Sequence, residues 1–183
     1  KKNEKEKLKK ENEKILTMKA LIDDACKEAR DNGRELLSQV ATTSVQSVYG
    51  ENTTVKLEPS IKDGITSIEV IVNKKVKDGT IRLNPRNADG GGLADIVSLS
   101  IFMALGQLVN NNYAPYLLDE PTKYVSEGEY AHNSAKFISD IVSYTGRQTI
   151  MSTHDKAIIE RDGILKRHLS MNEETGESII SLI

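Results

Sequence analysis

The chain has 183 residues, enough for one packed domain or for a smaller domain with an extended appendage. Its 25 lysines and arginines nearly balance 27 aspartates and glutamates, so the net charge of −2 does not by itself indicate a nucleic acid or an acidic substrate. The single cysteine, Cys26, excludes an internal disulfide and fits a reducing compartment. Because no apolar run reaches the roughly 18 residues of a membrane span, we expect a cytoplasmic protein without a membrane partner.

The first 50 residues predict a long helix with a coiled-coil seam. Apolar side chains recur there at the a and d positions of a heptad, at Leu8, Ile15, Met18, Ile22, Ala25, Ala29 and Leu36. A helix over about residues 4–48 would be roughly 65 Å long at 1.5 Å per residue, longer than a small domain is wide. Because so narrow an apolar stripe is marginal in water, we expect a partner helix to cover it. A surface helix with a solvated charged face is the alternative.

We assign residues 1–50 to this helix and residues 51–183 to a globular part, which begins with antiparallel strands. Strands are predicted where β-branched residues are frequent, at 53–57, 65–72 and 80–83. Turns are expected at Pro59, at Asp63-Gly64 and at residues 77–79. These strands carry no residue pattern that indicates a chemical role.

Three consecutive glycines precede the next predicted helix. Apolar residues from Leu93 to Leu108 follow a 3.6-residue spacing, which indicates a buried helix directly after Gly92. Glycines at a helix start leave backbone N–H groups accessible at the positive end of the helix dipole, which favours phosphate as a ligand. A flexible loop before a core helix is the alternative, because glycine runs occur in many loops.

The segment PYLLDEP, residues 115–121, predicts a short strand that ends in two acids. Its apolar residues do not alternate with polar ones, so we expect the strand to be buried on both faces. Asp119 and Glu120 follow at the carboxyl end, the edge where open α/β sheets bind ligands. Adjacent carboxylates there suggest one metal ligand and one general base, and a simple acidic turn is the alternative.

A helix at about 127–144, capped by Gly146, leads to a second buried strand at 147–153. Strand, helix and strand form a βαβ unit, whose right-handed crossover makes the two strands parallel. His154 is therefore expected at the same sheet edge as the two acids, where it could contact a phosphate. Residues 163–183 predict a terminal hairpin.

These segments together resemble a known family. The heptad helix, the glycine-led helix, the strand closed by Asp-Glu-Pro and the strand closed by Ser-Thr-His-Asp resemble, in this order, the carboxy-terminal half of an ABC-type ATPase head. More narrowly, the chain resembles the SMC-like ATPases that accompany a nuclease in DNA repair and recombination, the SbcC-type proteins and their phage relatives. The resemblance covers essentially the whole chain. It implies an α/β fold with a largely parallel sheet, an antiparallel β portion and a long amino-terminal coiled-coil helix.

The resemblance also implies roles for individual residues in binding and hydrolysing ATP. Asp119 would be the Walker B acid that holds Mg2+ through water, and Glu120 would be the general base that deprotonates the attacking water. His154 would be the switch histidine that senses the γ-phosphate. Two nucleotide-contacting segments are implied as well: the signature loop, which is Asp89, Gly90, Gly91 and Gly92, and the D-loop, residues 122–126, which ends in Ser126.

Two departures from the family's pattern bear on this mechanism. The signature loop commonly carries a serine that touches the γ-phosphate, and here Asp89 and Gly90 occupy the candidate positions. Because an aspartate repels a phosphate, either glycine N–H groups make the contact or Asp89 points elsewhere. The D-loop ends in Val125-Ser126 where Leu-Asp is usual, so direct communication between heads is expected to differ.

The P-loop is missing, because no GxxxxGK[ST] string occurs in the sequence. In this family that element belongs to the amino-terminal half, beyond the coiled coil. The chain also begins with Lys1 in place of Met, so we expect a lobe of a split head that is inactive alone. The implied partners are the P-loop half of the same head, a second head bridged by ATP, a nuclease subunit and DNA.

Other hypotheses stay open on the sequence. A chromosome-organising or defence-system SMC relative would keep the ATPase and lack the nuclease. A non-enzymatic coiled-coil protein with a degenerate head is favoured by Asp89 and by the missing P-loop, but it is opposed by the intact Asp119, Glu120 and His154. A transporter ATPase is the remaining alternative, in which a heptad arm has no evident place.

Overall fold

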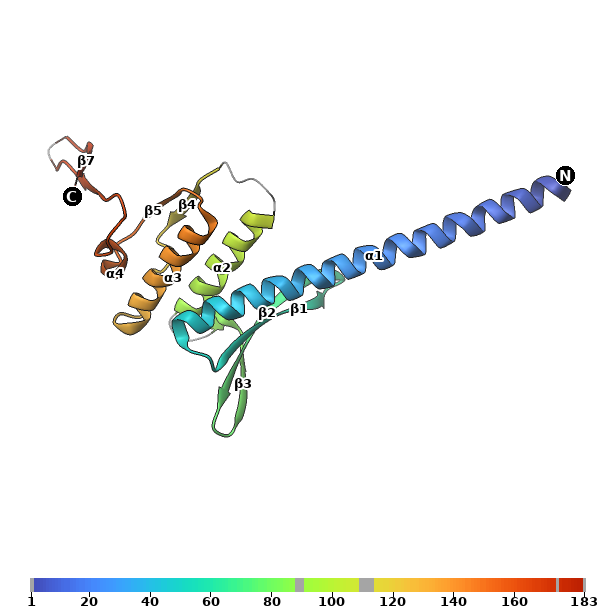
Figure 1. The fold of residues 1–183 in the computed structure, drawn as a ribbon, viewed down its shortest axis with the longest axis horizontal. Coiled ribbons are helices and arrows are strands. Elements are labelled where there is room, and N and C mark those ends of the chain that lie inside the picture. The colour runs from blue at the N-terminus through green and yellow to red at the C-terminus, as the bar shows by residue number, and fades with distance from the viewer. Residues whose placement is uncertain (1, 88–90, 109–113, 174, 183) are drawn as a thin grey trace.

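The computed structural model describes residues 2–87, 91–108, 114–173 and 175–182. One long helix, α1 (Lys2–Tyr49), extends from a small body of helices and short sheets (Figure 1). Within the described ranges, the first three strands form an antiparallel sheet, the next two a parallel pair, and the last two a hairpin. None of the helices in these ranges combines the length and the apolar character needed to cross a lipid bilayer.

The two ends of α1 lie in different surroundings. Its amino-terminal part stands clear of the body (Figure 1), and its heptad residues are exposed, with Leu8 at 62% and Ile22 at 59%. Its last turns pack into the core through Ala41, Val45 and Val48, each at most 1% exposed. The predicted helix is therefore confirmed, and the same helix forms both the arm and part of the core of the body.

The antiparallel sheet consists of β1 (Thr53–Lys62), β2 (Ile65–Val76) and β3 (Gly79–Leu83). The three predicted strands are confirmed, but the turn expected at Pro59 is wrong, because Pro59 lies inside β1 and pairs with Ile68. The N–H groups of Val55 and Leu57, on the same side of β1, point away from β2. Pro59, two residues after Leu57, lies on the same side of β1. The N–H that proline lacks would therefore point away from β2, so no hydrogen bond between β1 and β2 is lost, and this edge strand tolerates the proline.

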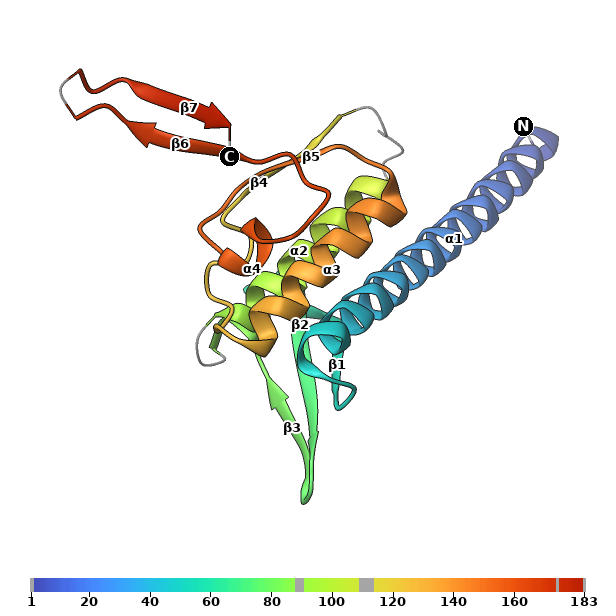
Figure 2. The same cartoon turned by 60° about the vertical axis from the view of Figure 1, so that its left-hand side comes forward.

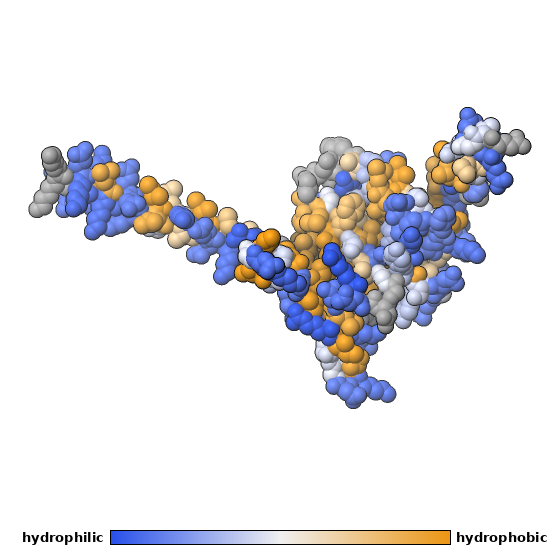
Figure 3. All heavy atoms as spheres, turned by 180° about the vertical axis from the view of Figure 1, so that it is seen from behind, coloured by the Kyte–Doolittle hydropathy of each residue, from blue (hydrophilic) through white to orange (hydrophobic). Residues whose placement is uncertain are grey.

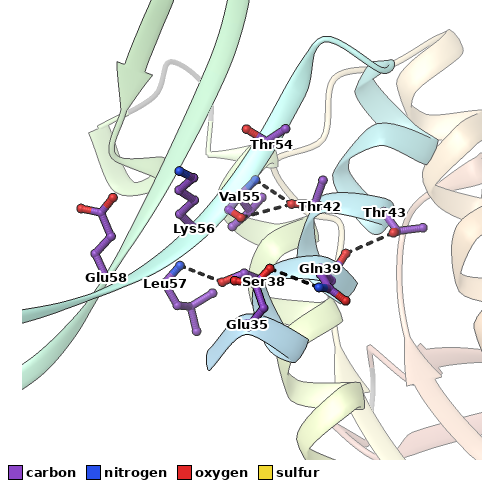
Figure 4. Close-up of a pocket in the computed structure, with 10 residues that line it drawn as sticks. All are labelled: Glu35, Ser38, Gln39, Thr42, Thr43, Thr54, Val55, Lys56, Leu57 and Glu58. Atoms are coloured by element: carbon purple, nitrogen blue, oxygen red, sulfur yellow. Dashed lines mark hydrogen bonds between the residues drawn. The ribbon is translucent and has the colours of Figure 1, made fainter. Parts of the chain in front are cut away.

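The outer edge of β1 is closed by hydroxyl groups of α1 (Figure 4). Thr42 Oγ1 accepts a hydrogen bond from Val55 N–H (2.8 Å) and donates one to Val55 O (3.1 Å). Ser38 Oγ accepts from Leu57 N–H at 3.0 Å. These bonds satisfy edge groups that would otherwise be unpaired, and they tie the base of the arm directly to the sheet.

The remaining elements form the half of the body that holds the predicted site. They are listed in chain order: the 3-10 turn η1 (Pro85–Asn87), α2 (Gly92–Leu108), β4 (Tyr116–Asp119), α3 (Glu129–Thr145), β5 (Thr149–Ser152) and α4 (Lys156–Ile159). Strands β4 and β5 are parallel, with Tyr116 opposite Thr149, so the predicted βαβ unit is confirmed. Gly146 ends α3 in a left-handed conformation with φ 60°, as expected for its cap.

The terminal hairpin is also confirmed, as β6 (Arg167–Met171) paired with β7 (Ser178–Leu182). It stands away from the body in two views (Figures 1 and 2). Leu169 lies opposite Ile180, and both are about two thirds exposed, at 67% and 69%. One face of the hairpin therefore presents apolar side chains that the described part of the chain does not cover.

The expectation that β4 and β5 are buried on both faces is wrong. Tyr116 is 3% exposed and donates its hydroxyl hydrogen to Met103 O at 2.9 Å, so one face packs on α2. Leu117 and Ile150 are register neighbours on the other face, and they are 68% and 54% exposed. No element in the described ranges covers this second face, and the rear view shows apolar residues gathered over the body (Figure 3).

Helix α2 is likewise buried on only one side. Ile96, on the apolar stripe of the predicted 3.6-residue spacing, is fully buried in the core, and so is Met103, which that stripe did not include. Phe102, Leu105 and Leu108, however, are between 44% and 54% exposed. Large apolar side chains left exposed on one side of a helix in this way indicate a surface that can bind a partner.

Candidate functional site

The two acids and the histidine meet at one edge of the parallel strands, as the sequence predicts. Asp119 ends β4 opposite Ser152, which ends β5. Glu120 continues the pairing for one more residue, because its N–H donates to Ser152 O at 2.9 Å. His154 follows Ser152 by two residues, so the loops after both strands leave the sheet side by side.

Glu120 has an unusual backbone conformation and a directed carboxylate. Its φ of 45° lies in the left-handed region, which a residue with a side chain adopts at an energetic cost. Oε2 accepts a hydrogen bond from the backbone N–H of His154 at 3.3 Å, and Oε1 lies 3.5 Å from Nε2 of the same residue. The Glu120 side chain is 23% exposed and that of His154 is 98% exposed. The carboxylate is thus held against the second loop, while the imidazole is open to solvent.

Asp119 lies at the same edge with an exposed side chain. Within the described ranges, no three His, Cys, Asp or Glu side chains come close enough together to hold a metal ion. Asp119 could contribute one carboxylate to a bound Mg2+. Mg2+ is usually bound by one or two carboxylates together with water and substrate phosphates.

The segment 122–126 is attached at two points to other elements. The Thr122 hydroxyl, on a residue 3% exposed, donates to Asp155 Oδ2 at 3.0 Å. The Tyr124 N–H donates to Asp95 Oδ2 at 2.9 Å. Ser126, the last residue of the segment, is exposed. Neither Asp95 nor Asp155 was predicted as a site residue.

The two described glycines at the start of α2, Gly91 and Gly92, contact this same segment. A Cβ atom at Gly92 would lie 2.7 Å from Tyr124 O and 2.8 Å from Val125 Cα, closer than real Cβ atoms approach. Gly91 has a φ of 74°, and a Cβ atom there would make a tight contact of 3.0 Å with the Tyr124 side chain. These glycines therefore let 122–126 pack on the start of α2. Asp89 and Gly90, the other two residues of the predicted signature loop, lie outside the described residues.

The carboxyl end of α1 lies close to Asp95 and to the start of α3. The Tyr49 ring lies 5.0 Å from the Tyr130 ring, and burial together with the nearby Asp95 carboxylate raises the pKa of Tyr49 to about 12. Burial also raises the pKa of Asp95, although the hydrogen bond from Tyr124 N–H acts in the opposite direction. An acid in the first turn of an otherwise apolar helix was the signal in the sequence that could have identified Asp95.

An open cleft of about 670 Å³ lies beside these groups. Its lining comes from the loop after β4, the start of α3, and α4 with the loop before it, and includes Glu120, Thr122, His132, His154 and Asp155. The catalytic candidates Glu120 and His154 thus face a space that a ligand can enter. Asp119 is not among the residues that line it.

Comparison with known proteins identifies the fold. No protein-family model matches this sequence, and no curated protein matches it. A solved structure from work described as "Structural biochemistry of ATP-driven dimerization and DNA stimulated activation of SMC ATPases" matches with a TM-score of 0.59 and 16% sequence identity. The match covers 86% of this chain and 89% of the other. This chain therefore has the fold of an SMC ATPase chain, a mixed α/β body with a long amino-terminal helix.

Proposed function

We propose that this chain is the carboxy-terminal lobe of an SMC-like ATPase head, which hydrolyses ATP when a P-loop half completes it. The observation that carries the proposal is the contact between the Glu120 carboxylate and His154 at the carboxyl edge of two parallel strands. The shared fold with an SMC ATPase supports it. Residues 1–50 act as the coiled-coil arm and residues 51–183 as the head lobe.

In this proposal each residue at the edge has a separate task. Asp119 holds Mg2+, which stabilises the negative charge of the β- and γ-phosphates when it is bound. The Glu120 carboxylate, already oriented by the His154 N–H, accepts a proton from the attacking water. The exposed imidazole of His154 contacts the γ-phosphate. The signature loop, Asp89 to Gly92, and Ser126 contact the nucleotide that a second head holds.

The uncovered surfaces support the need for another lobe. Leu117 and Ile150 lie side by side on the open face of the parallel strands, and both are more than half exposed. Full burial of an exposed side chain of this size contributes about 1.5–3 kcal/mol, and the part of that energy still available at these two residues favours a partner on this face. We propose that the P-loop half covers this face and supplies the main seat for the phosphates.

Further partners belong to the same proposal. The matched structure is described with the words "ATP-driven dimerization" and "DNA stimulated activation", and we propose both behaviours for this protein. The exposed seam at Leu8, Ile15 and Ile22 suits a returning helix of the arm. We further propose that the complete protein works in the cytoplasm with a nuclease subunit in DNA repair or recombination. Co-purification of a nuclease through the base of the arm tests that last point, and an SMC relative without a nuclease is the alternative outcome.

Glu120→Gln in the complete protein tests the proposed ATPase. The amide cannot accept the proton of water, so steady-state hydrolysis should fall at least about 100-fold while ATP still binds and the paired heads accumulate. Measurements of phosphate release and of ATP-dependent dimerisation check both effects. Glu58→Gln, at a half-exposed glutamate of β1 paired with Arg82, is the matched control and should retain turnover. Unchanged turnover in Glu120→Gln would contradict the proposal.

A further inference from the structure

The segment 122–126 is a tight turn that contacts both the start of α2 and the loop that follows β5. Inside it, Lys123 N–H donates to Glu120 O at 3.1 Å and Val125 N–H donates to Thr122 O at 2.9 Å. The turn therefore begins at the predicted general base and is hydrogen-bonded to its backbone. Contacts that hold this turn in place therefore also restrict the position of the Glu120 backbone.

One fixed point of the turn is Asp155. Its Oδ2 accepts from the buried Thr122 hydroxyl at 3.0 Å, and its Oδ1 accepts from Ala157 N–H at 2.9 Å, which caps α4. Both carboxylate oxygens are thus engaged. Hydrogen bonds to an ionised carboxylate are stronger than neutral ones, so the contact is well suited to hold a loop. Asp155 directly follows His154, and a shift of one displaces the other.

The second fixed point is Asp95 in the first turn of α2. Its Oδ2 accepts from Tyr124 N–H at 2.9 Å, and its own N–H donates to Gly91 O at 3.1 Å. The same part of the turn packs on Gly92, where no Cβ would fit. The glycine-led start of α2 and the turn are therefore joined by a hydrogen bond and by direct backbone contact.

We propose that Asp95 and Asp155 are positioning residues for hydrolysis, which hold segment 122–126 at two points and so fix Glu120 and His154 relative to the start of α2. This inference rests on the proposed ATPase function. One hydrogen bond joins Asp95 to Tyr124, and another joins Thr122 to Asp155. Each bond links residues about 30 positions apart in the sequence. The role of both acids is to orient the loops that carry Glu120 and His154.

Thr122→Val in the complete protein tests the contact to Asp155. Valine keeps the shape of threonine and removes the hydroxyl donor, so kcat should fall by about tenfold or more with little change in KM, because phosphoryl transfer depends mainly on positioning. Thr122→Ser restores the hydroxyl and should recover most of the turnover. Thr145→Val is the matched control, because the Thr145 hydroxyl bonds only within α3, to Val142 O.

Asp95 is tested in the same way. Asp95→Ala removes the acceptor for Tyr124 N–H and should lower kcat, whereas Asp95→Asn keeps a carbonyl oxygen at that place and should retain most of it. Hydrogen exchange provides a readout that does not depend on ATP. The amides of residues 120–126 should exchange faster in Asp95→Ala and Thr122→Val than in the wild type or in Thr145→Val.

The outcomes separate this inference from the proposed function. If the complete wild-type protein hydrolyses ATP and both Thr122→Val and Asp95→Ala have an unchanged kcat, the positioning role is overturned. The ATPase proposal is then left intact. Unchanged exchange of residues 120–126 would overturn the positioning role as well. If the complete wild-type protein does not hydrolyse ATP, the proposed function fails, and with it the role in hydrolysis. Loss of kcat together with faster local exchange, at an unchanged melting temperature, supports the inference.

Discussion

At the scale of single residues, the acids of this chain differ in what surrounds them. Glu120 and Asp155 have specific hydrogen-bond donors, whereas Asp119 is exposed at the sheet edge. Asp95 is half-buried beside Tyr49 and receives one backbone hydrogen bond. Burial disfavours its charged form, so its pKa is raised. A carboxyl group whose pKa is raised on folding makes the free energy of unfolding depend on pH in mildly acidic solution.

Asp95→Asn should change how stability depends on pH. The folded chain keeps the Asp95 proton to a higher pH than the unfolded chain does, so the contribution of this group to stability falls as pH rises through its raised pKa. The asparagine variant does not titrate, and its stability relative to the wild type should therefore increase between about pH 4 and pH 7. Urea unfolding at both pH values measures this difference. A relative stability that decreases over the same interval would contradict the assignment.

The same variant should lower the pKa of Tyr49. The Asp95 carboxylate contributes to the raised value of about 12, but burial is the larger cause. The pKa of Tyr49 should therefore fall in Asp95→Asn and remain above its ordinary value of 10. An NMR titration of the tyrosine ring signals follows this change.

At the scale of elements, the arm is joined to the body by polar contacts as well as by apolar packing. The hydroxyl groups of Ser38 and Thr42 bind the free edge of β1, while Ala41 and Val45 on the same helix pack in the core. A helix that contacts a strand edge in this way cannot slide along it without breaking hydrogen bonds. The position of the arm is therefore coupled to the antiparallel sheet.

Thr42→Val should destabilise the chain by about 1–3 kcal/mol, because the partly buried N–H and C=O of Val55 lose their partner. Thr43→Val is the matched control, since the Thr43 hydroxyl is exposed and bonds only to Gln39 O in its own helix. That variant should stay within about 0.5 kcal/mol of the wild type. Equal free energies of unfolding for the two variants would show that the contact to β1 contributes nothing.

At the scale of the whole molecule, the most informative feature is the apolar surface that the described chain leaves uncovered. It includes one face of β4 and β5 and part of α2, in addition to the seam of α1 and one face of the terminal hairpin. A complete soluble domain rarely exposes apolar side chains on so many of its elements. This distribution supports the proposal that the chain is one lobe of a larger head.

Leu117→Asp should prevent assembly with the P-loop half while leaving this chain folded. Leu117 is 68% exposed here, so a charge at this position costs little in the isolated lobe, but it would be buried and unpaired in the proposed interface. Ile61→Asp, at a residue 75% exposed near the tip of β1, is the matched control. Co-purification of the two halves measures assembly. Normal assembly of Leu117→Asp would exclude this face as the interface.

Much of this molecule follows from the sequence alone, because its helices and strands depend on neighbouring residues. The heptad of α1, the 3.6-residue spacing of α2 and the glycine cap at Gly146 are local patterns, and the structure confirms the two helices and the cap that they predicted. The βαβ rule, by which two strands connected through a helix pair in parallel, correctly predicted that Glu120 and His154 meet at one edge. These features need no knowledge of which surfaces pack together.

Only the tertiary structure decided the rest. Whether Leu117 is buried depends on which elements cover it, and Pro59 fits inside β1 because its side of the strand faces away from β2. Asp95 and Asp155 reach segment 122–126 across 29 and 33 residues of sequence, a separation that no local pattern encodes. Hydrogen bonds between distant segments form only after packing has brought them together, so the contacts proposed to position the site could not be predicted from the sequence.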